Sequence, residues 1–386
     1  MLSKTFRPVL WVAALILIVG MACSIGSGPA PTPTLEPTQP PPPTATPQPE
    51  PTQPPPPTAT QPPPPTPTVE ETGGMETEIV PGAPPFELEG QETSFADGVY
   101  TVYAPLGWTP NESTAAVSFE EPAGGAGAFI YLQATNTGYE LDFESFQRFV
   151  QAREANFFGD YDNYAQTDEQ FNEEKQLGYV AKTLDFDGVP QVVETYYDQH
   201  GAIIYAIDFW VDADSYDAYA PMFDEFFNGV TVDTDIAAQS DVYNWVWTFY
   251  GPDDLFSIEV PTAWRYERST GESTVVDTFY SPDEHAVIQN IAYDDGTAVS
   301  KSKAGAFALA LLKNFYADDI KITGDKVQPD GSERLTWNSP GGDYSGISFF
   351  ESRGTTFLLF TVMYDNPYED YYLDTLNYTI STYDVP

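Results

Sequence analysis

Few residues of this sequence could carry out chemistry. The chain has two His and one Cys among its 386 residues. A nucleophilic site needs a Ser, Thr or Cys beside a base such as His or Lys. His200 stands beside Gly201 of a predicted hairpin, and His285 lies in the turn Pro282-Asp-Glu-His. We expect both His residues to be exposed turn residues rather than members of a catalytic pair.

Two short motifs resemble parts of known active sites. Ser300-Lys-Ser-Lys303 fits the SxxK pattern of penicillin-recognising enzymes, but no SDN or KTG triplet follows it. Gly124-Gly-Ala-Gly127 has neither the GxGxxG spacing nor the Lys of a P-loop, and it predicts a flexible turn. We therefore expect no catalytic residues, no cofactor-binding residues and no enzymatic activity.

The acidic clusters do not form a recognisable metal site. Asp212-Ala-Asp214-Ser-Tyr-Asp217 begins like a calcium loop, but its sixth residue is Asp217 instead of Gly and its twelfth is Phe223 instead of Glu. This segment predicts a capped helix start, whereas Asp294-Asp295-Gly296 and Asp253-Asp254 predict turns. No metal ligand is assigned. With 58 acidic residues, a carboxylate pair that cleaves glycosidic bonds stays an alternative.

The charge balance excludes one class of partner. The chain has 15 Lys and Arg against 58 Asp and Glu, which gives a formal charge of −43. Proteins that bind nucleic acids gain affinity by replacing counterions with Lys and Arg, so no nucleic-acid partner is expected. Such a surface keeps a protein soluble and raises the local concentration of cations. Weak calcium binding is therefore an alternative function.

The first 23 residues have the pattern of an export signal. Lys4 and Arg7 precede an apolar run from Val9 to Ala22, which suits a secretory h-region and is too short to span the ~30 Å of hydrocarbon comfortably. Gly20-Met-Ala-Cys23 resembles the bacterial lipobox, which implies that Cys23 receives lipid. We expect residues 1–23 to be a lipoprotein signal peptide and the protein to be anchored by lipid on the extracytoplasmic face of the cell membrane. A retained N-terminal anchor and ordinary secretion are the alternatives.

Residues 24–92 form a predicted disordered linker. From Pro29 to Thr68, 20 of 40 residues are Pro and 10 are Thr, so the segment lacks the apolar residues needed for a core. The sequence EPTQPPPPTAT occurs at residues 36–46 and again at 50–60. Polyproline II structure would make this linker a semi-rigid stalk. A signal peptide, a Cys and a Pro/Thr-rich stalk together resemble surface lipoproteins of bacteria.

The remaining chain contains an internal repeat. Tyr100-Thr-Val-Tyr-Ala-Pro105-Leu-Gly-Trp108 aligns with Phe256-Ser-Ile-Glu-Val-Pro261-Thr-Ala-Trp264, and both predict a short strand closed by Pro, with a Trp that folds back over a sheet. Thr195 to Gly201 likewise aligns with Ser348 to Gly354, each predicting a hairpin with Gly at the turn. The structural signature of the repeat is Pro105, Trp108, Gly201, Pro261, Trp264 and Gly354.

Helices are predicted between and after these anchors. Asp142 is a predicted N-cap, and apolar residues then recur at helical spacing. Asn366-Pro367 predicts the cap and first position of a last helix, while Pro221 predicts a break or a late start in the corresponding helix of the first repeat. The two stripes expected to be buried are Phe143, Phe146, Val150 and Phe157 in the first repeat, and Ala304, Phe307, Leu311 and Phe315 in the second.

The order of strands and helices predicts an α+β fold with two similar antiparallel-sheet domains, at residues 94–235 and 242–386. The opening segment Phe256 to Trp264 resembles that of the PsbP-like (Mog1/PsbP) family. This resemblance implies tandem α-β-α sandwiches that act as accessory or binding modules rather than enzymes. It assigns no partner-binding residue.

The predicted function is that of a membrane-anchored, extracytoplasmic lipoprotein that binds an unknown protein or cell-envelope partner without catalysis or a cofactor. A carbohydrate-binding or carbohydrate-cleaving surface protein is one alternative, and a weak divalent-cation binder is the other. With 25 Tyr, 25 Phe and 7 Trp in the chain, exposed rings would favour sugars, whereas buried rings favour the plain binding module.

Overall fold

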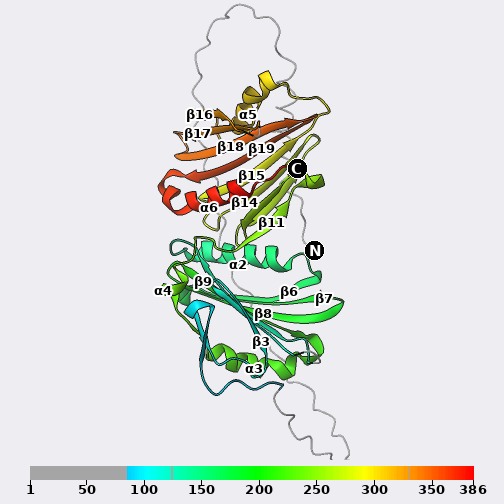
Figure 1. The fold of residues 1–386 in the computed structure, drawn as a ribbon, viewed down its shortest axis with the longest axis vertical. Helices are drawn as coiled ribbons and strands as arrows, with labels where there is room; N and C mark the ends of the chain where they lie inside the picture. Colours follow the sequence, from blue (N-terminus) through cyan, green and yellow to red (C-terminus); the bar gives the residue numbers. More distant parts are fainter. Residues whose placement is uncertain (1–84, 123–124, 330) are drawn as a thin grey trace, which may run out of the picture. The chain divides into compact units, whose positions relative to one another are not determined.

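The computed structural model describes residues 85–122, 125–329 and 331–386. These residues form two seven-stranded antiparallel sheets, one in each predicted repeat (Figure 1). Both sheets belong to one compact unit. The fold is mainly antiparallel sheet with a few packed helices, which confirms this part of the predicted fold class.

The first sheet has the strand order β3-β4-β5-β9-β8-β7-β6. Every second residue of β7 from Gly178 to Leu184 is buried, as expected of a strand whose two faces differ in exposure. Its strands are β3 (Thr109–Ser113), β4 (Ala116–Glu120), β5 (Phe129–Asn136), β6 (Asp162–Asn172), β7 (Leu177–Phe186), β8 (Val189–His200) and β9 (Ile203–Asp212).

The second sheet has the order β13-β14-β15-β19-β18-β17-β16, which repeats the first order strand for strand. The shared topology agrees with the internal repeat predicted from the sequence. Its strands are β13 (Arg265–Thr270), β14 (Thr274–Tyr280), β15 (Ala286–Tyr293), β16 (Lys321–Val327), β17 (Glu333–Ser339), β18 (Tyr344–Arg353) and β19 (Thr356–Asp365).

The aligned glycines lie at the predicted turns. Gly201 joins β8 to β9 with φ +59°, and Gly354 joins β18 to β19 with φ +62°. These left-handed conformations favour Gly because it has no Cβ. Residues of the two repeats can therefore be matched by counting from Gly201 in the first hairpin and from Gly354 in the second.

The aligned Pro and Trp residues also occupy similar places. Pro261 is the last residue of β12 (Ser257–Pro261), which pairs with β11 (Val246–Tyr250), and Pro105 forms an isolated bridge with Leu88. Trp108 and Trp264 are both buried in apolar clusters. A further small sheet contains β1 (Thr93–Phe95), β2 (Tyr100–Val102) and β10 (Thr231–Val232).

Two helices pack on the first sheet. Helix α2 (Phe143–Phe158) begins at Asp142, whose side chain accepts a hydrogen bond from the Ser145 amide at 2.8 Å and so confirms the predicted cap. Its apolar side chains contact one cluster of sheet residues, and those of α3 (Tyr216–Asn228) contact another. The short helix α4 (Thr234–Ala237) follows.

Two helices pack in the same manner on the second sheet. Helix α5 (Lys301–Phe315) buries Leu311 and Leu312 against one cluster of sheet residues. Helix α6 (Glu369–Thr382) buries Tyr372 and Leu376 against another. One helix between the anchors and one after them is the order that the sequence predicted.

The predicted apolar stripe of α2 is wrong at one position. Phe157 is 36% exposed, whereas its neighbour Phe158 is fully buried beside Trp210. The inward positions run through Phe146, Phe149 and Val150 to Phe158. Phe157 instead lies over Tyr131, with 6.2 Å between the ring centroids.

Pro221 does not break the first-repeat helix. Helix α3 continues from Tyr216 to Asn228 with Pro221 inside it. A Pro removes the backbone bond to the carbonyl four residues earlier, which belongs to Asp217. Both residues are exposed, so water can satisfy that carbonyl. The predicted break is absent because Pro221 lies near the start of α3 and because Pro221 and Asp217 are exposed.

Three other local predictions need correction. The last helix is preceded by a 3-10 turn (Asn366–Tyr368) capped at Asp365, one residue earlier than predicted. Asp212 does not cap the following turn, because its carboxylate accepts from Gln191 at 2.7 Å instead. The packed part of the first repeat begins before residue 94, since Phe86 is buried 4.9 Å from the Trp108 ring.

The predicted signal peptide, Cys23 and the Pro/Thr-rich segment lie outside the described residues. From residue 85 onward, no helix is long and apolar enough to cross a membrane in the described ranges.

Candidate functional site

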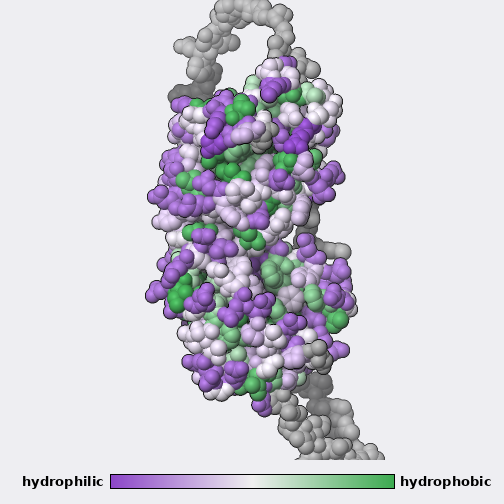
Figure 2. Space-filling view, viewed as in Figure 1, coloured by the Kyte–Doolittle hydropathy of each residue, from purple (hydrophilic) through white to green (hydrophobic). Residues whose placement is uncertain are grey.

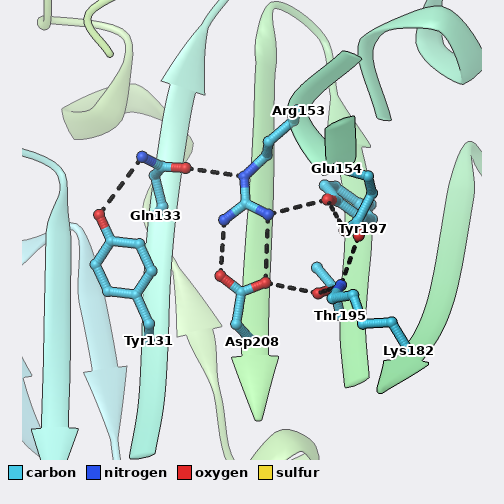
Figure 3. A network of polar contacts seen from close by, with 8 residues as sticks. All are labelled: Tyr131, Gln133, Arg153, Glu154, Lys182, Thr195, Tyr197 and Asp208. Atoms are coloured by element: carbon cyan, nitrogen blue, oxygen red, sulfur yellow. Dashed lines mark hydrogen bonds and ion pairs between the residues drawn. The ribbon is translucent and has the colours of Figure 1, made fainter. Parts of the chain in front are cut away.

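A group of charged side chains that contact one another is buried in the first repeat, between α2 and the sheet. We call it the charged network (Figure 3). Its Arg153 forms a bidentate ion pair with Asp208, with nitrogen–oxygen distances of 2.7 and 3.3 Å. The network consists of Tyr131, Gln133, Arg153, Glu154, Lys182, Thr195, Tyr197 and Asp208.

A second ion pair completes the network. Lys182 Nζ donates to Glu154 at 2.6 Å and to Thr195 Oγ1 at 2.6 Å. The Thr195 hydroxyl donates in turn to Asp208 at 2.7 Å, and Tyr197 donates to Glu154 at 2.5 Å. Two cations therefore face two carboxylates, and the buried charges compensate one another.

Burial and charge shift the proton affinities of these groups in different directions. For Lys182, burial is the largest effect and lowers the pKa, against the opposing attraction of Glu154. Burial also disfavours the Arg153 cation, but Asp208 and the other partners outweigh it and raise the Arg153 pKa. The Tyr197 pKa is raised, mainly by burial.

The charged side chains of the network are shielded from solvent. Lys182, Thr195 and Asp208 are each 0% exposed, and Arg153 is 1% exposed. Thr195 beside Lys182 has the makings of a nucleophile and base, but a substrate would need access to both atoms. In this structure the network can therefore hold α2 against the sheet, but Thr195 and Lys182 are not accessible to a substrate.

The second repeat builds the same region from uncharged side chains. Counting from the two helix caps, Leu311 and Leu312 stand where the first repeat has Arg153 and Glu154. Counting from the two hairpin glycines, Thr361 corresponds to Asp208. The charged network is thus particular to the first repeat.

The first repeat also contains an open cavity of about 410 Å³, on which the candidate ligand site is built. We call it the tyrosine pocket. Tyr179 and Tyr196 are cross-strand neighbours with ring centroids 5.0 Å apart, and Phe227 of α3 lies 4.7 Å from Tyr196. The pocket is lined by Gln170, Phe171, Asn172, Leu177, Gly178, Tyr179, Tyr196, Tyr197, Asp198, Tyr205 and Phe227.

Carboxylates fix the orientation of the tyrosines in and beside the pocket. Tyr205 donates to Asp198 at 2.7 Å, and Tyr179 donates to Glu194 at 2.5 Å. Burial is the largest cause of the raised pKa of each phenol, and it raises that of Tyr196 to about 12. These phenols stay protonated at neutral pH, so the pocket presents aromatic rings and carboxylate oxygens.

A corresponding cavity of about 330 Å³ lies in the second repeat. Phe349 and Glu351 line it where the first repeat has Tyr196 and Asp198. The C-terminal segment also lines this cavity, and Tyr383 stacks on Phe360 with ring centroids 4.3 Å apart. The chain therefore fills part of the second cavity with its own side chains.

The two His residues lie apart. His200 is exposed at the end of β8, as predicted, with its Nε2 atom 3.1 Å from Asp198. His285 is only partly exposed, which corrects the predicted exposed turn. Its Nδ1 atom lies 2.8 Å from Asp365, and its ring stacks on Tyr368 at a centroid distance of 3.7 Å.

The other predicted motifs are not brought together into a site. Ser300 and Lys303 lie at the start of α5, and the Asp294 turn is closed by a hydrogen bond from the Gly296 amide at 2.8 Å. Asp253 and Asp254 lie in a 3-10 turn (Pro252–Asp254), as predicted. Over the described ranges, no three His, Cys, Asp or Glu residues are grouped so as to hold a metal ion.

The sequence reasoning missed the charged network, although one signal was available. Arg153 and Glu154 follow Phe146 and Val150 at helical spacing, so they occupy core positions of α2. Charged residues at such positions must find partners across the core. Lys182 on β7, with alternate residues buried, carried the matching signal.

Proteins similar to this chain were found among solved structures. No protein-family profile and no curated protein matches the sequence. The chain is similar to the solution structure of cyanobacterial PsbP (CyanoP) from Synechocystis sp., with 11% identity, a TM-score of 0.29, and coverage of 42% of this chain and 98% of that one. It is also similar to a protein from Bacteroides thetaiotaomicron, with 10% identity, a TM-score of 0.27, and coverage of 44% and 56%.

A third match is the apo structure of the immunity protein TplEi of T6SS from Pseudomonas aeruginosa. The identity is 10%, the TM-score is 0.21, and the match covers 76% of this chain and 96% of that one. Matches at these identities and TM-scores assign no function to this chain.

Proposed function

We propose that this chain is an extracytoplasmic, lipid-anchored binding module without catalytic activity. In this proposal lipid on Cys23 holds the protein at the membrane, and the Pro/Thr-rich stalk carries two PsbP-like α-β-α domains. The tyrosine pocket is the ligand site. The observation that carries the proposal is the contrast between the closed charged network and the open pocket in the same repeat.

The properties of the pocket suit a small ligand. Its volume of about 410 Å³ falls in the usual range for small-molecule sites, which are mostly apolar with a few placed polar groups. Tyr179, Tyr196 and Tyr205 are all partly exposed there. Since carboxylates hold the Tyr179 and Tyr205 hydroxyls, these rings lose little further freedom when a ligand binds.

The distribution of aromatic residues favours a binding module over a broad sugar platform. Most of the described Trp, Phe and Tyr rings lie in the apolar clusters or pack against them, whereas others are exposed, such as Tyr250 at 63% exposure and Tyr378 at 47%. In the view of Figure 2, hydrophobic residues form small separate patches among hydrophilic ones. A large exposed apolar surface would instead indicate a protein or membrane contact.

A ligand screen on the purified full chain tests the proposal. Sugars, short peptides and small organic ions of the cell envelope are compared by ligand-observed NMR with the unmodified protein and with Tyr205→Leu, which introduces the residue of the second repeat. Loss of one aromatic contact should weaken a pocket ligand by about tenfold. The control is Tyr250→Ala, which removes an exposed ring outside the pocket.

Two results would contradict the proposal. Ligands that bind both variants as well as the unmodified protein would place the site elsewhere. A ligand that is converted to product during the measurement would show that the protein is an enzyme.

A further inference from the structure

The two repeats differ in where the positive charge lies beside their corresponding cavities. In the second repeat Arg334 pairs across the strands with Phe349, and its guanidinium carbon lies 6.0 Å from the centroid of the Phe349 ring. Arg353 lines the cavity and contacts Glu351 at 3.1 Å. The second repeat thus places one Arg over an aromatic ring of its cavity and a second Arg in the cavity lining.

The first repeat keeps the aromatic and acidic groups but loses both arginines. Tyr179 stands in place of Arg334 and pairs with Tyr196, the equivalent of Phe349. Asp198 stands in place of Glu351, and His200 in place of Arg353. None of the residues that line the tyrosine pocket is Lys or Arg.

The charge of the first repeat increases this imbalance. Residues 93–240 contain four Lys and Arg against 26 Asp and Glu. Two of the four, Arg153 and Lys182, are buried in the charged network and face carboxylates there. The remaining two cannot balance the surface, so its potential draws cationic solutes toward the repeat.

The hydrogen bonds of the pocket distinguish between ligand classes. A sugar presents hydroxyls that both donate and accept, but the hydroxyls of Tyr179 and Tyr205 already donate to carboxylates. Calcium would need six to eight converging oxygens, whereas this pocket offers mainly ring faces. Ring faces beside carboxylates suit an organic cation, which interacts with both.

Resting on the proposed binding function, we propose that the tyrosine pocket binds a small soluble organic cation with an alkylated ammonium group. The ammonium group lies against the rings of Tyr179 and Tyr196 and near the carboxylate of Asp198.

The test compares choline with 3,3-dimethylbutan-1-ol, which has nearly the same shape but no charge. Ligand-observed NMR on the full chain should show choline binding at least about tenfold more tightly than the neutral alcohol. Tyr179→Arg introduces the second-repeat residue and should abolish choline binding, because it removes one of the two rings and adds a positive charge beside the other. Tyr179→Phe keeps the ring and should leave choline binding within about twofold.

Further variants separate a lost site from a lost fold. Asp198→Asn removes one negative charge and should weaken choline binding without affecting the neutral alcohol. Tyr250→Ala is the control outside the pocket, and the thermal unfolding curve of each variant shows whether it is folded.

The outcomes distinguish this inference from the proposed function. Equal binding of choline and the alcohol, with both lost in Tyr179→Arg, would overturn the cation inference and keep the pocket as a ligand site. No binding of choline would also overturn it, and the envelope screen with Tyr205→Leu would then decide the proposed function separately. Choline binding that survives both Tyr179→Arg and Asp198→Asn would refute the site itself.

Discussion

Lys182 and Trp337 occupy equivalent places in the two repeats, and each donates a hydrogen bond to a buried hydroxyl. The Lys182 Nζ atom lies 2.6 Å from Thr195 Oγ1, and the Trp337 Nε1 atom lies 2.9 Å from Ser348 Oγ. One fold thus accommodates a buried cation in the first repeat and an indole ring in the second.

Breaking the charged network should be costly. Asp208→Ala leaves the Arg153 cation buried without its partner, so we expect the variant to lose about 3 to 5 kcal/mol of unfolding free energy. Urea denaturation of the full chain, followed by a probe of the first repeat, measures the loss. The matched control is Thr361→Ala, which removes the equivalent uncharged residue and should cost less.

Replacing the whole network should be tolerated. Arg153→Leu, Glu154→Leu, Lys182→Trp and Asp208→Thr together introduce the second-repeat residues. Val193→Gly must accompany them, because a Cβ atom on Gly346, its equivalent, would lie 2.3 Å from the Trp337 ring. Well-packed apolar replacements of buried ion networks are often neutral or stabilising by about 1 to 4 kcal/mol. Unfolding of the combined variant at lower urea than Asp208→Ala would contradict this expectation.

Two buried Trp residues of the second repeat should respond differently to removal of the indole nitrogen. Trp264 is fully buried and its Nε1 atom has no hydrogen-bond partner, whereas Trp337 Nε1 donates to Ser348. Trp337→Phe leaves the Ser348 hydroxyl without this donor, so it should cost about 1 kcal/mol more than Trp264→Phe. Trp264→Ala should cost about 3 to 5 kcal/mol, as expected for emptying a buried aromatic site.

Thermal and urea unfolding of these variants measure whether Trp337→Phe loses more stability than Trp264→Phe, and how much Trp264→Ala loses. An equal cost for the two Trp→Phe variants would show that the bond to Ser348 contributes nothing. Residues 242–386 are also predicted to fold alone, and an unfolded wild-type fragment would contradict that domain boundary.

The cap of α2 should depend on pH. The bond from the Ser145 amide is the main reason why the Asp142 pKa is lowered from 3.8. A lowered carboxyl pKa stabilises the fold above pH 3.8, and this contribution is lost as the pH falls through the folded-state value. Asp142→Ala should cost about 1 kcal/mol at pH 7 and less in acid, while Asp142→Asn keeps an acceptor that does not titrate.

Urea denaturation at pH 7 and pH 3 measures the difference. Ser300→Ala is the matched control, because Ser300 precedes α5 at the same position but its side chain makes no cap bond. If Asp142→Ala lost the same stability at both pH values, the cap would not depend on the carboxylate charge.

Lipidation of Cys23 is tested by Cys23→Ala. The variant should lose incorporated fatty acid and move from the membrane to the soluble extracytoplasmic fraction, because the only Cys of the chain would be gone. Metabolic labelling with a fatty-acid analogue measures the incorporated fatty acid, and applying it to separated membrane and soluble fractions shows where the protein lies. Unchanged labelling of the variant would rule out this anchor.

Calcium should bind only weakly. The described residues hold no grouped metal ligands, and diffuse carboxylates raise the local calcium concentration without forming a cage. We expect a dissociation constant no tighter than about 10⁻⁴ to 10⁻³ M, weakened further by monovalent salt. Calorimetry decides, since a saturable micromolar site that persists in high salt would reveal an organised cage.

The sequence by itself determined the repeat and its turns, because these depend on local backbone requirements. Gly201 and Gly354 mark turns with positive φ, and the Asp142 cap needs only the amide three residues on. Such features are readable from a few neighbouring residues. The break predicted at Pro221 failed because its cost depends on exposure, which a local pattern does not give.

The charged network and the tyrosine pocket were decided only by the tertiary structure. Strand register brings Lys182, Thr195 and Asp208 together from three different strands, and α2 adds Arg153 above them. A shift of one residue in that register would turn every one of these side chains to the opposite face of its strand. Their types are visible in the sequence, but whether a charge is paired, buried or open to a ligand depends on contacts between residues far apart in the chain.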